Sequence, residues 1–469
     1  ISNGGNESSE NLPHLLILVR YRLITGLAGS REIVRSALRY ARSVKATDGA
    51  VELDDSASYM IRFSNNEITV SKVFRETTTS VYLAFGERRG VGSISVPSVG
   101  EVGKLIKGLA STIKLAAPSD IYAPLPRGPF KYEAKLLRRG GRTPPEALVE
   151  WVSEAISGAQ SAGAKRVAGS LILRRGRRIL YTTGGVRAEA TSERIELSVR
   201  AFLDGESSGQ FSTATASREE FAPRKVGETA GEIASMARNP VSGEAGVYDA
   251  ILGPMVFANI LEEVGEAASA YSVLTGLSFL TDKLNEQVSS RILTLIDDPT
   301  IETAYGSEPF DDEGLPTRRK AIIESGILKT YLHNSATAKK FNVESTANAG
   351  WINPAPFNLV VEGGSATLNS LLSRVDRGIL VTNDWYLRYR NIRTGDFSTL
   401  PRDGLFLVKN GSIEAALKDL RISDNILRML ANLEDMTADK YWIKWWEVET
   451  PVKAPYALIR SVNFTKSTF

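Results

Sequence analysis

The sequence contains no cysteine and only two histidines, and these absences exclude several kinds of site. Without cysteine, the chain of 469 residues has no disulfides, thiolate metal sites, cysteine nucleophile or cysteine-ligated iron–sulfur cluster. A zinc site built from two or three imidazoles would need both His14 and His333, which lie far apart in the sequence. The two counts remove most metalloenzymes and many hydrolases from consideration.

Long apolar runs and a strong net charge are also lacking. The longest apolar run near the start, residues 15–19, is interrupted by Arg20 and Arg22, far short of the ~20 apolar residues that cross a membrane. The formal net charge of +3 is too small to indicate a nucleic-acid partner. We therefore expect a cytoplasmic protein that binds neither a membrane nor nucleic acid.

Apolar residues make up 42% of the chain and charged residues 24%, which is typical of a globular protein. We predict a loosely attached tail over residues 1–30, an N-terminal domain over residues 31–240 and a C-terminal domain over residues 241–469. Many strands with few intervening helices favour an α+β fold with antiparallel sheets, not a doubly wound parallel sheet.

The N-terminal domain shows an internal duplication. A pattern of helix, antiparallel strands and helix over residues 31–120 recurs over residues 145–237. The motif Gly-Glu-x-x-Gly-x-x-Ser occurs at residues 86–93 and again at 205–212, a shift of 119. We interpret these glycines as turn residues between strands and not as a phosphate-binding loop. The sequence thus predicts duplicated helix–antiparallel-strand units followed by a strand-rich C-terminal domain.

Two charged runs suggest functional hypotheses. The run Arg-Arg-Gly-Arg-Arg at residues 174–178 could bind phosphate or nucleic acid, but we predict a solvated hairpin tip there. Residues 297–313 hold seven carboxylates, which raises the hypothesis of a Mg²⁺ or Ca²⁺ site. Their spacing matches no calcium loop. We therefore interpret them as turn residues bonding local backbone, with Arg318 and Arg319 offsetting part of the charge.

Two further features have structural interpretations. His333 follows a predicted strand, and a lone histidine without an identifiable Ser or Asp partner is usually structural. Three of the six tryptophans lie within residues 442–446. We predict that Trp445 is buried against the core and that Trp442 and Trp446 lie at an interface.

Five motifs follow one another in the second half of the chain: TLIDDP at 294–299, FDDEGLPT at 310–317, IESGILK at 323–329, STAN at 345–348 and TGDFS at 394–398. Together they resemble the TldD/PmbA family, once labelled modulators of DNA gyrase. The resemblance covers residues 31–433. It implies a cytoplasmic peptidase system of two related subunits. The TldD-like subunit carries zinc on a His-Glu-x-x-x-His helix and a late cysteine, whereas the TldE-like subunit, also called PmbA, lacks that site.

The helix expected over residues 255–270 determines which branch the chain resembles. At the two histidine positions this sequence has Leu261 and Glu266, and only the general-base position is kept, as Glu262. The late cysteine is absent, with residues 440–446 in its neighbourhood. Leucine cannot ligate zinc, and one glutamate alone makes a poor zinc site. The resemblance is therefore to the metal-free TldE-like branch, with no intact catalytic site and no metal or other cofactor in this chain.

The glutamates of this helix also have a structural interpretation. We interpret Glu262, Glu263 and Glu266 as a solvated helix face and not as a new metal site.

Three functions remain open at this stage. The first is a non-catalytic subunit of a zinc metallopeptidase that acts on extended or unfolded peptides. Such a subunit would form a dimer with a TldD-like partner, which would carry the zinc, or with itself. The second is a stand-alone peptidase with a different centre, such as the carboxylates of residues 297–313. The third is a non-enzymatic regulator that binds a DNA-associated target, as the older family label suggests.

Overall fold

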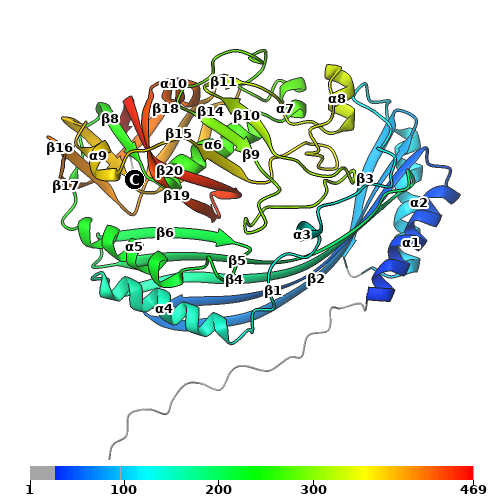
Figure 1. The fold of residues 1–469 in the computed structure, drawn as a ribbon, viewed down its shortest axis with the longest axis horizontal. Coiled ribbons are helices and arrows are strands. Elements are labelled where there is room, and N and C mark those ends of the chain that lie inside the picture. Colours follow the sequence, from blue (N-terminus) through cyan, green and yellow to red (C-terminus); the bar gives the residue numbers. More distant parts are fainter. Residues whose placement is uncertain (1–26, 96, 468–469) are drawn as a thin grey trace, which may run out of the picture.

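The computed structural model describes residues 27–95 and 97–467 (Figure 1). Most of the predicted tail lies outside these residues, but its last four residues belong to the first helix. The helices are α1 (Leu27–Ser43), α2 (Val99–Leu115), α3 (Ala134–Leu137), α4 (Ala147–Ser161), α5 (Pro223–Met236), α6 (Pro254–Ala267), α7 (Ala270–Leu274), α8 (Ser335–Phe341), α9 (Leu368–Leu372) and α10 (Ile426–Ala431). None of the helices in the described ranges has both the length and the apolar character needed to cross a membrane.

A six-stranded antiparallel sheet forms the N-terminal half. Its strands are β1 (Asp48–Ser64), β2 (Glu67–Phe85), β3 (Arg88–Ser95), β4 (Arg166–Thr182), β5 (Arg187–Phe202) and β6 (Ser208–Thr215). The strand order is β3-β2-β1-β4-β5-β6, so β1 and β4 pair at the centre and each unit of three strands runs outward from that pair. The two glycine motifs begin at the β2–β3 and β5–β6 turns. Figure 1 shows α1 and α2 beside one end of the sheet and α4 and α5 beside the other. The predicted α+β class with duplicated units is confirmed.

Local signals explain why α2 starts at Val99. The Ser98 side chain accepts a hydrogen bond from the Glu101 backbone N–H at 3.3 Å, and the Ser98 N–H donates to the Glu101 carboxylate at 3.0 Å. These two bonds satisfy the backbone N–H groups of Ser98 and Glu101, which have no partner within the helix. Val102, Ile106 and Ile113 then recur on one buried face, which packs the helix onto the sheet.

The arginine run at residues 174–178 is not a hairpin tip, so that prediction was wrong. Residues 166–182 form one continuous strand, β4, in which Gly176 lies opposite Ser56 of β1 and Ser192 of β5. The strand β2 is likewise long, and it runs without interruption from Glu67 to Phe85. Long-range pairing with neighbouring strands overrides the local turn signal of an arginine–glycine run.

A 14-stranded sheet forms the strand-rich C-terminal half. Its strands are β7 (Val241–Ser242), β8 (Gly246–Leu252), β9 (Thr294–Asp297), β10 (Lys320–Glu324), β11 (Ile327–Leu328), β12 (Leu359–Glu362), β13 (Arg377–Val381), β14 (Asp384–Asn391), β15 (Asp396–Pro401), β16 (Leu405–Lys409), β17 (Ser412–Lys418), β18 (Leu420–Asn425), β19 (Leu433–Trp445) and β20 (Val448–Lys466). β20 pairs with four strands, β8, β12, β18 and β19. Figure 1 shows this half on one face of the six-stranded sheet, with α4 and α5 on the other.

Candidate functional site

The helix α6 contains Leu261, Glu262 and Glu266, the positions at which the sequence resemblance leads us to expect a degenerate zinc site, and it lies inside the C-terminal domain. It begins at Pro254. Proline lacks a backbone N–H, but an N–H at the first helical position has no partner within the helix, so no hydrogen bond is lost. Phe257, Ile260, Leu261 and Val264 are fully buried, and the helix contacts β12, β14, β19 and β20. Because strands pack around much of α6, Asn259 and Glu262 are buried although both are polar, whereas Glu263 is half-buried.

Glu262 is a buried carboxyl group, so the interpretation of a solvated helix face is wrong at this residue. Only 6% of the residue is exposed, and its Oε1 accepts a hydrogen bond from the Thr450 backbone N–H at 2.5 Å. Burial raises the pKa of Glu262 to about 8, from an ordinary value near 4.5. No local sequence pattern indicates this burial, because the covering strand β20 lies far along the chain. Glu266 is exposed.

Two more carboxyl groups near α6 share this character. The Tyr389 hydroxyl hydrogen-bonds to Glu263, and burial raises the pKa of Glu263 to about 7. Asp384 accepts hydrogen bonds from the Thr399 hydroxyl at 2.7 Å and the Asn259 side-chain amide at 3.2 Å. Burial raises the pKa of Asp384 to about 7 as well. Chemically, these groups exchange protons close to neutral pH.

The turn between β19 and β20 brings residues 440–446 next to α6. Trp445 is 1% exposed and its ring centroid lies 6.3 Å from that of Trp385, so its predicted burial is confirmed. Trp446 is 51% exposed and packs against Tyr386, with ring centroids 5.5 Å apart. The aromatic groups therefore extend from the core to the surface.

The side chains at this position do not fit a zinc ion. Leu261 offers no donor atom, and the Glu262 carboxyl already accepts the Thr450 N–H. α6 is a continuous helix through Gly265, so residues 261 and 266 point about 140° apart. A Cβ on Gly265 would come within 2.7 Å of Leu359, which gives this glycine a packing role. Among residues 27–95 and 97–467, no group of three or more His, Asp or Glu side chains is placed to hold a metal ion.

The acidic block meets the arginine run in space, which sequence reasoning missed. The Arg178 guanidinium donates to Glu52 at 2.6 Å and also to Asp312, and it lies 4.9 Å from the Phe310 ring centroid. Arg194 of β5 pairs with Glu308. Arginines of the six-stranded sheet thus offset part of the charge of the block. Arg319 lies 3.9 Å from Asp298 and offsets another part, as predicted, whereas Arg318 donates to the Ser345 carbonyl.

Other carboxylates of the block have local or structural roles. The Asp311 side chain accepts from the backbone N–H groups of Glu313 at 3.0 Å and Leu315 at 2.9 Å, as the turn interpretation predicts. Asp297 is fully buried and pairs with Lys320 at 3.0 Å. These interactions of Asp311 and Asp297 hold the loop against the rest of the fold.

His333 is buried beside α8. Its Nδ1 lies 3.2 Å from the Thr337 hydroxyl, and its ring contacts Phe341 edge-on. Burial lowers the pKa of His333 to about 4. The neutral ring thus packs in the interior, in keeping with the structural interpretation.

Comparison with known proteins identifies the family. The PmbA/TldA metallopeptidase central domain matches residues 139–238, and the PmbA/TldA metallopeptidase C-terminal domain matches residues 245–466. The chain belongs to the PmbA/TldD family. Its structure is similar to that of TldE from Thermococcus kodakarensis, with a TM-score of 0.80 and 20% identity over 92% of this chain and 100% of that one. At this identity, the likeness shows a shared fold.

Curated PmbA/TldD relatives match over part of their length. A metalloprotease from Methanocaldococcus jannaschii is 36% identical over 204 residues, which cover 41% of this chain and 44% of that protein. A metalloprotease PmbA homologue from Haemophilus influenzae is 34% identical over 185 residues, covering 38% of this chain and 40% of that protein. The match therefore spans less than half the length of each relative. The family is metallopeptidase-related.

The buried Glu262 predicts a measurable pH dependence of stability. Between pH values near 4.5 and 8 the unfolded chain loses this proton while the folded chain keeps it, so the stability of the native protein falls as pH rises. Glu262→Gln cannot ionise and keeps an acceptor for the Thr450 N–H. Near pH 4.5 we expect Glu262→Gln and the native chain to have equal free energies of unfolding, measured with urea. At pH 8 we expect the variant to be more stable by about 2 kcal/mol. Glu232→Gln, an exposed position on α5, is the control and should show no such pH-dependent difference.

Proposed function

We propose that this chain is the TldE/PmbA-like, non-catalytic subunit of a two-subunit zinc metallopeptidase that acts on extended or unfolded peptides in the cytoplasm. The observation that carries the proposal is α6. Where the TldD-like branch has histidines, this helix has a buried Leu261 and a Glu266, and Glu262 is bonded to the backbone of β20. Zinc hydrolysis requires a metal-activated water, and these side chains provide no ligand set for the metal.

A partner subunit follows from this proposal. The partner would be a TldD-like chain that holds the zinc, and self-association is the alternative. Tyr386 and Trp446 are 48% and 51% exposed and touch one another, and exposed aromatic side chains are enriched at protein interfaces. In this proposal they help the chain form one wall of the partner's peptide cleft.

The other two hypotheses have less support. A stand-alone peptidase centred on residues 297–313 would need free carboxylates, but Asp312, Glu308 and Asp297 are paired with cations of this chain. A regulator bound to a DNA-associated target would need an accessible basic surface. The run at residues 174–178 lies within the sheet, where the Arg177 side chain is 7% exposed and pairs with Asp55.

A mixing assay tests the proposed function. We expect no peptidase activity from this chain alone. A TldD-like partner should gain at least about tenfold in activity on mixing, equal to ~1.4 kcal/mol of transition-state stabilisation. The assay uses an unfolded peptide, each subunit alone and both together, with elemental analysis for zinc in each.

Two results would contradict the proposal. Activity from this chain alone that survives both chelation and Glu262→Ala would show that the chain is catalytic. The absence of any gain on mixing would remove the partner role. Trp446→Ala, at the exposed aromatic surface, should reduce the gain without changing the stability of the chain by more than about 1 kcal/mol.

A further inference from the structure

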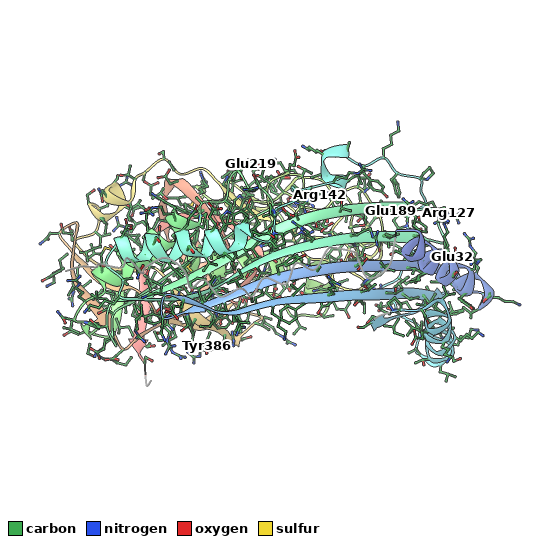
Figure 2. All side chains as sticks on the ribbon, turned by 90° about the horizontal axis from the view of Figure 1, so that it is seen from below. Glu32, Arg127, Arg142, Glu189, Glu219 and Tyr386 are labelled. Carbon is green, nitrogen blue, oxygen red and sulfur yellow. The ribbon has the colours of Figure 1, made fainter. Side chains whose placement is uncertain are left out.

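A loop between α3 and α4, residues 138–142, crosses the open edge of β5. β6 pairs only with residues 195–202 of β5, and the loop occupies the edge beyond it. The Arg139 N–H donates to the Thr191 carbonyl at 3.0 Å, and the Glu193 N–H donates to the Arg139 carbonyl at 3.1 Å. These backbone bonds fix the loop, and hence its side chains, against the sheet. Figure 2 places Arg142 between α1 and α4 along the length of the sheet.

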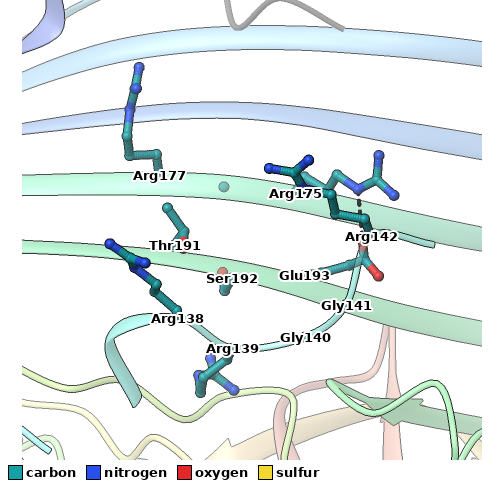
Figure 3. Close-up of a pocket in the computed structure, with 11 residues that line it drawn as sticks. Arg138, Arg139, Gly140, Gly141, Arg142, Arg175, Arg177, Thr191, Ser192 and Glu193 are labelled. Carbon is teal, nitrogen blue, oxygen red and sulfur yellow. Dashed lines mark hydrogen bonds and ion pairs between the residues drawn. The ribbon is translucent and has the colours of Figure 1, made fainter. Parts of the chain in front are cut away.

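A cavity of about 690 Å³ opens beside this loop, and arginines dominate its lining (Figure 3). Its charged lining residues are Arg138, Arg139, Arg142, Arg175, Arg177 and a single carboxylate, Glu193. Figure 3 shows the side chains of Arg138, Arg142, Arg175 and Arg177 on one side of the loop and Arg139 turned to the other. Cavities of this volume are typical of small-molecule sites.

Two arginines at the floor of the cavity, Arg175 and Arg177, are paired with carboxylates, whereas two at its rim, Arg138 and Arg142, are not paired within the described residues. Arg175 pairs with Glu193 at 2.5 Å, and Arg177 pairs with Asp55 at 2.9 Å. Arg139 donates to the carbonyl oxygens of Ala304, at 2.8 Å, and Ser307 on the other side of the loop.

The rim arginines, Arg138 and Arg142, have no such partners. In the part of the chain that the structure describes, neither guanidinium group forms a hydrogen bond or an ion pair, and no acceptor bonds the backbone N–H groups of Gly140 and Gly141. Two guanidinium groups and two backbone donors are therefore available at one opening.

We propose that this cavity binds a small anion that carries two or more negative charges on carboxylate or phosphate groups. The two rim guanidiniums supply planar, paired donors that match carboxylate and phosphate oxygens. Thr191 and Ser192, which also line the cavity, add hydroxyl groups. Because Arg175 and Arg177 are already paired with carboxylates, the two rim arginines contribute most to the positive charge that faces a ligand. Nothing that supports this site depends on the proposed peptidase assembly.

Calorimetric titration of the full chain tests this site, with pyrophosphate and citrate as separate probes at constant ionic strength. We expect saturable binding at one site by at least one probe. Arg138→Ala and Arg142→Ala should each weaken that binding by about tenfold or more, since each removes charge-assisted hydrogen bonds. Arg238→Ala, at an exposed arginine on another surface, should leave it unchanged.

The two probes distinguish the chemistry of the ligand. Binding of pyrophosphate alone assigns the site to phosphates, binding of citrate alone assigns it to carboxylates, and binding of both supports the shared chemistry. No saturable binding of either probe up to about 10 mM, or binding that neither rim variant weakens, would overturn the proposal. Thermal melts of the variants, which should match the native chain, exclude misfolding as the cause of a loss.

Discussion

Replacing Arg178 by alanine is expected to destabilise the chain by about 3–5 kcal/mol, because it leaves buried carboxylates without their counter-charge. Arg178 is 14% exposed and lies in β4. It pairs with Glu52 of the neighbouring strand and with Asp312 of the C-terminal domain, and it donates to the Phe310 carbonyl at 3.0 Å. The substitution therefore disrupts both the sheet and its contact with the acidic loop. Urea unfolding followed by circular dichroism measures the loss.

Matched variants separate the unpaired charge from the lost side-chain volume. Arg174→Ala, four residues earlier on the same strand, breaks a pair with Asp54 in which both side chains are about half exposed, and should change stability by less than about 1 kcal/mol. Arg178→Met combined with Glu52→Gln and Asp312→Asn should recover much of the loss, because it removes the carboxylate charges as well. Equal losses from Arg174→Ala and Arg178→Ala would show that burial of the pair has no energetic consequence.

Truncating Trp445 to alanine is expected to destabilise the chain by about 3–5 kcal/mol, through lost apolar contact and a residual cavity. The side chain is almost fully buried, and it belongs to the largest apolar core, which includes Leu261 and Val448. Its indole Nε1 has no hydrogen-bond partner among the described residues. The loss is therefore one of packing and not of hydrogen bonding.

Two companion variants test this interpretation of Trp445. Trp446→Ala removes the exposed neighbour and should change stability by less than about 1 kcal/mol. Trp445→Phe keeps most of the packing and removes the unpaired N–H, so its effect should be clearly smaller than that of alanine. A phenylalanine variant as unstable as the alanine variant would indicate that the indole N–H forms a bond that stabilises the fold. Unfolding is followed by circular dichroism, because replacing a tryptophan changes the fluorescence signal itself.

Features that depend on neighbouring residues could be predicted from the sequence. The start of α2 follows from Ser98 and Glu101, three residues apart, and the tip between β1 and β2 from Asn65 and Asn66, both of which have positive φ. The duplication is visible because the Gly-Glu-x-x-Gly-x-x-Ser motif occurs twice, each time at a turn between two strands. The helix α6 follows from Gly253-Pro254, which begins it, and from the apolar residues that come next.

Features that depend on distant strands could not be predicted. Gly176 within the arginine run suggested a turn, but β1 and β5 hold it extended. The counter-charge of Arg178 comes from Glu52 and Asp312, far from it in sequence. Glu262 is covered by β20, where the Thr450 backbone N–H, 188 positions further along the chain, donates to its carboxylate, and no local pattern encodes that contact. Burial of polar groups is set by tertiary contacts, which explains why the charged positions were those most often misinterpreted.

The position of β20 has a consequence for how the chain is made. β8, β12, β18 and β19 all precede it in sequence, yet each pairs with it, and Leu252 pairs with Ala457 about 200 residues further on. During synthesis these strands leave the ribosome before the strand that joins them. Closure of the sheet across such separations is intrinsically slow, since the loop entropy is lost before the contacts form. The nascent C-terminal half thus exposes unpaired strand edges until residues 448–466 emerge, and chaperones that bind such edges would act in that interval.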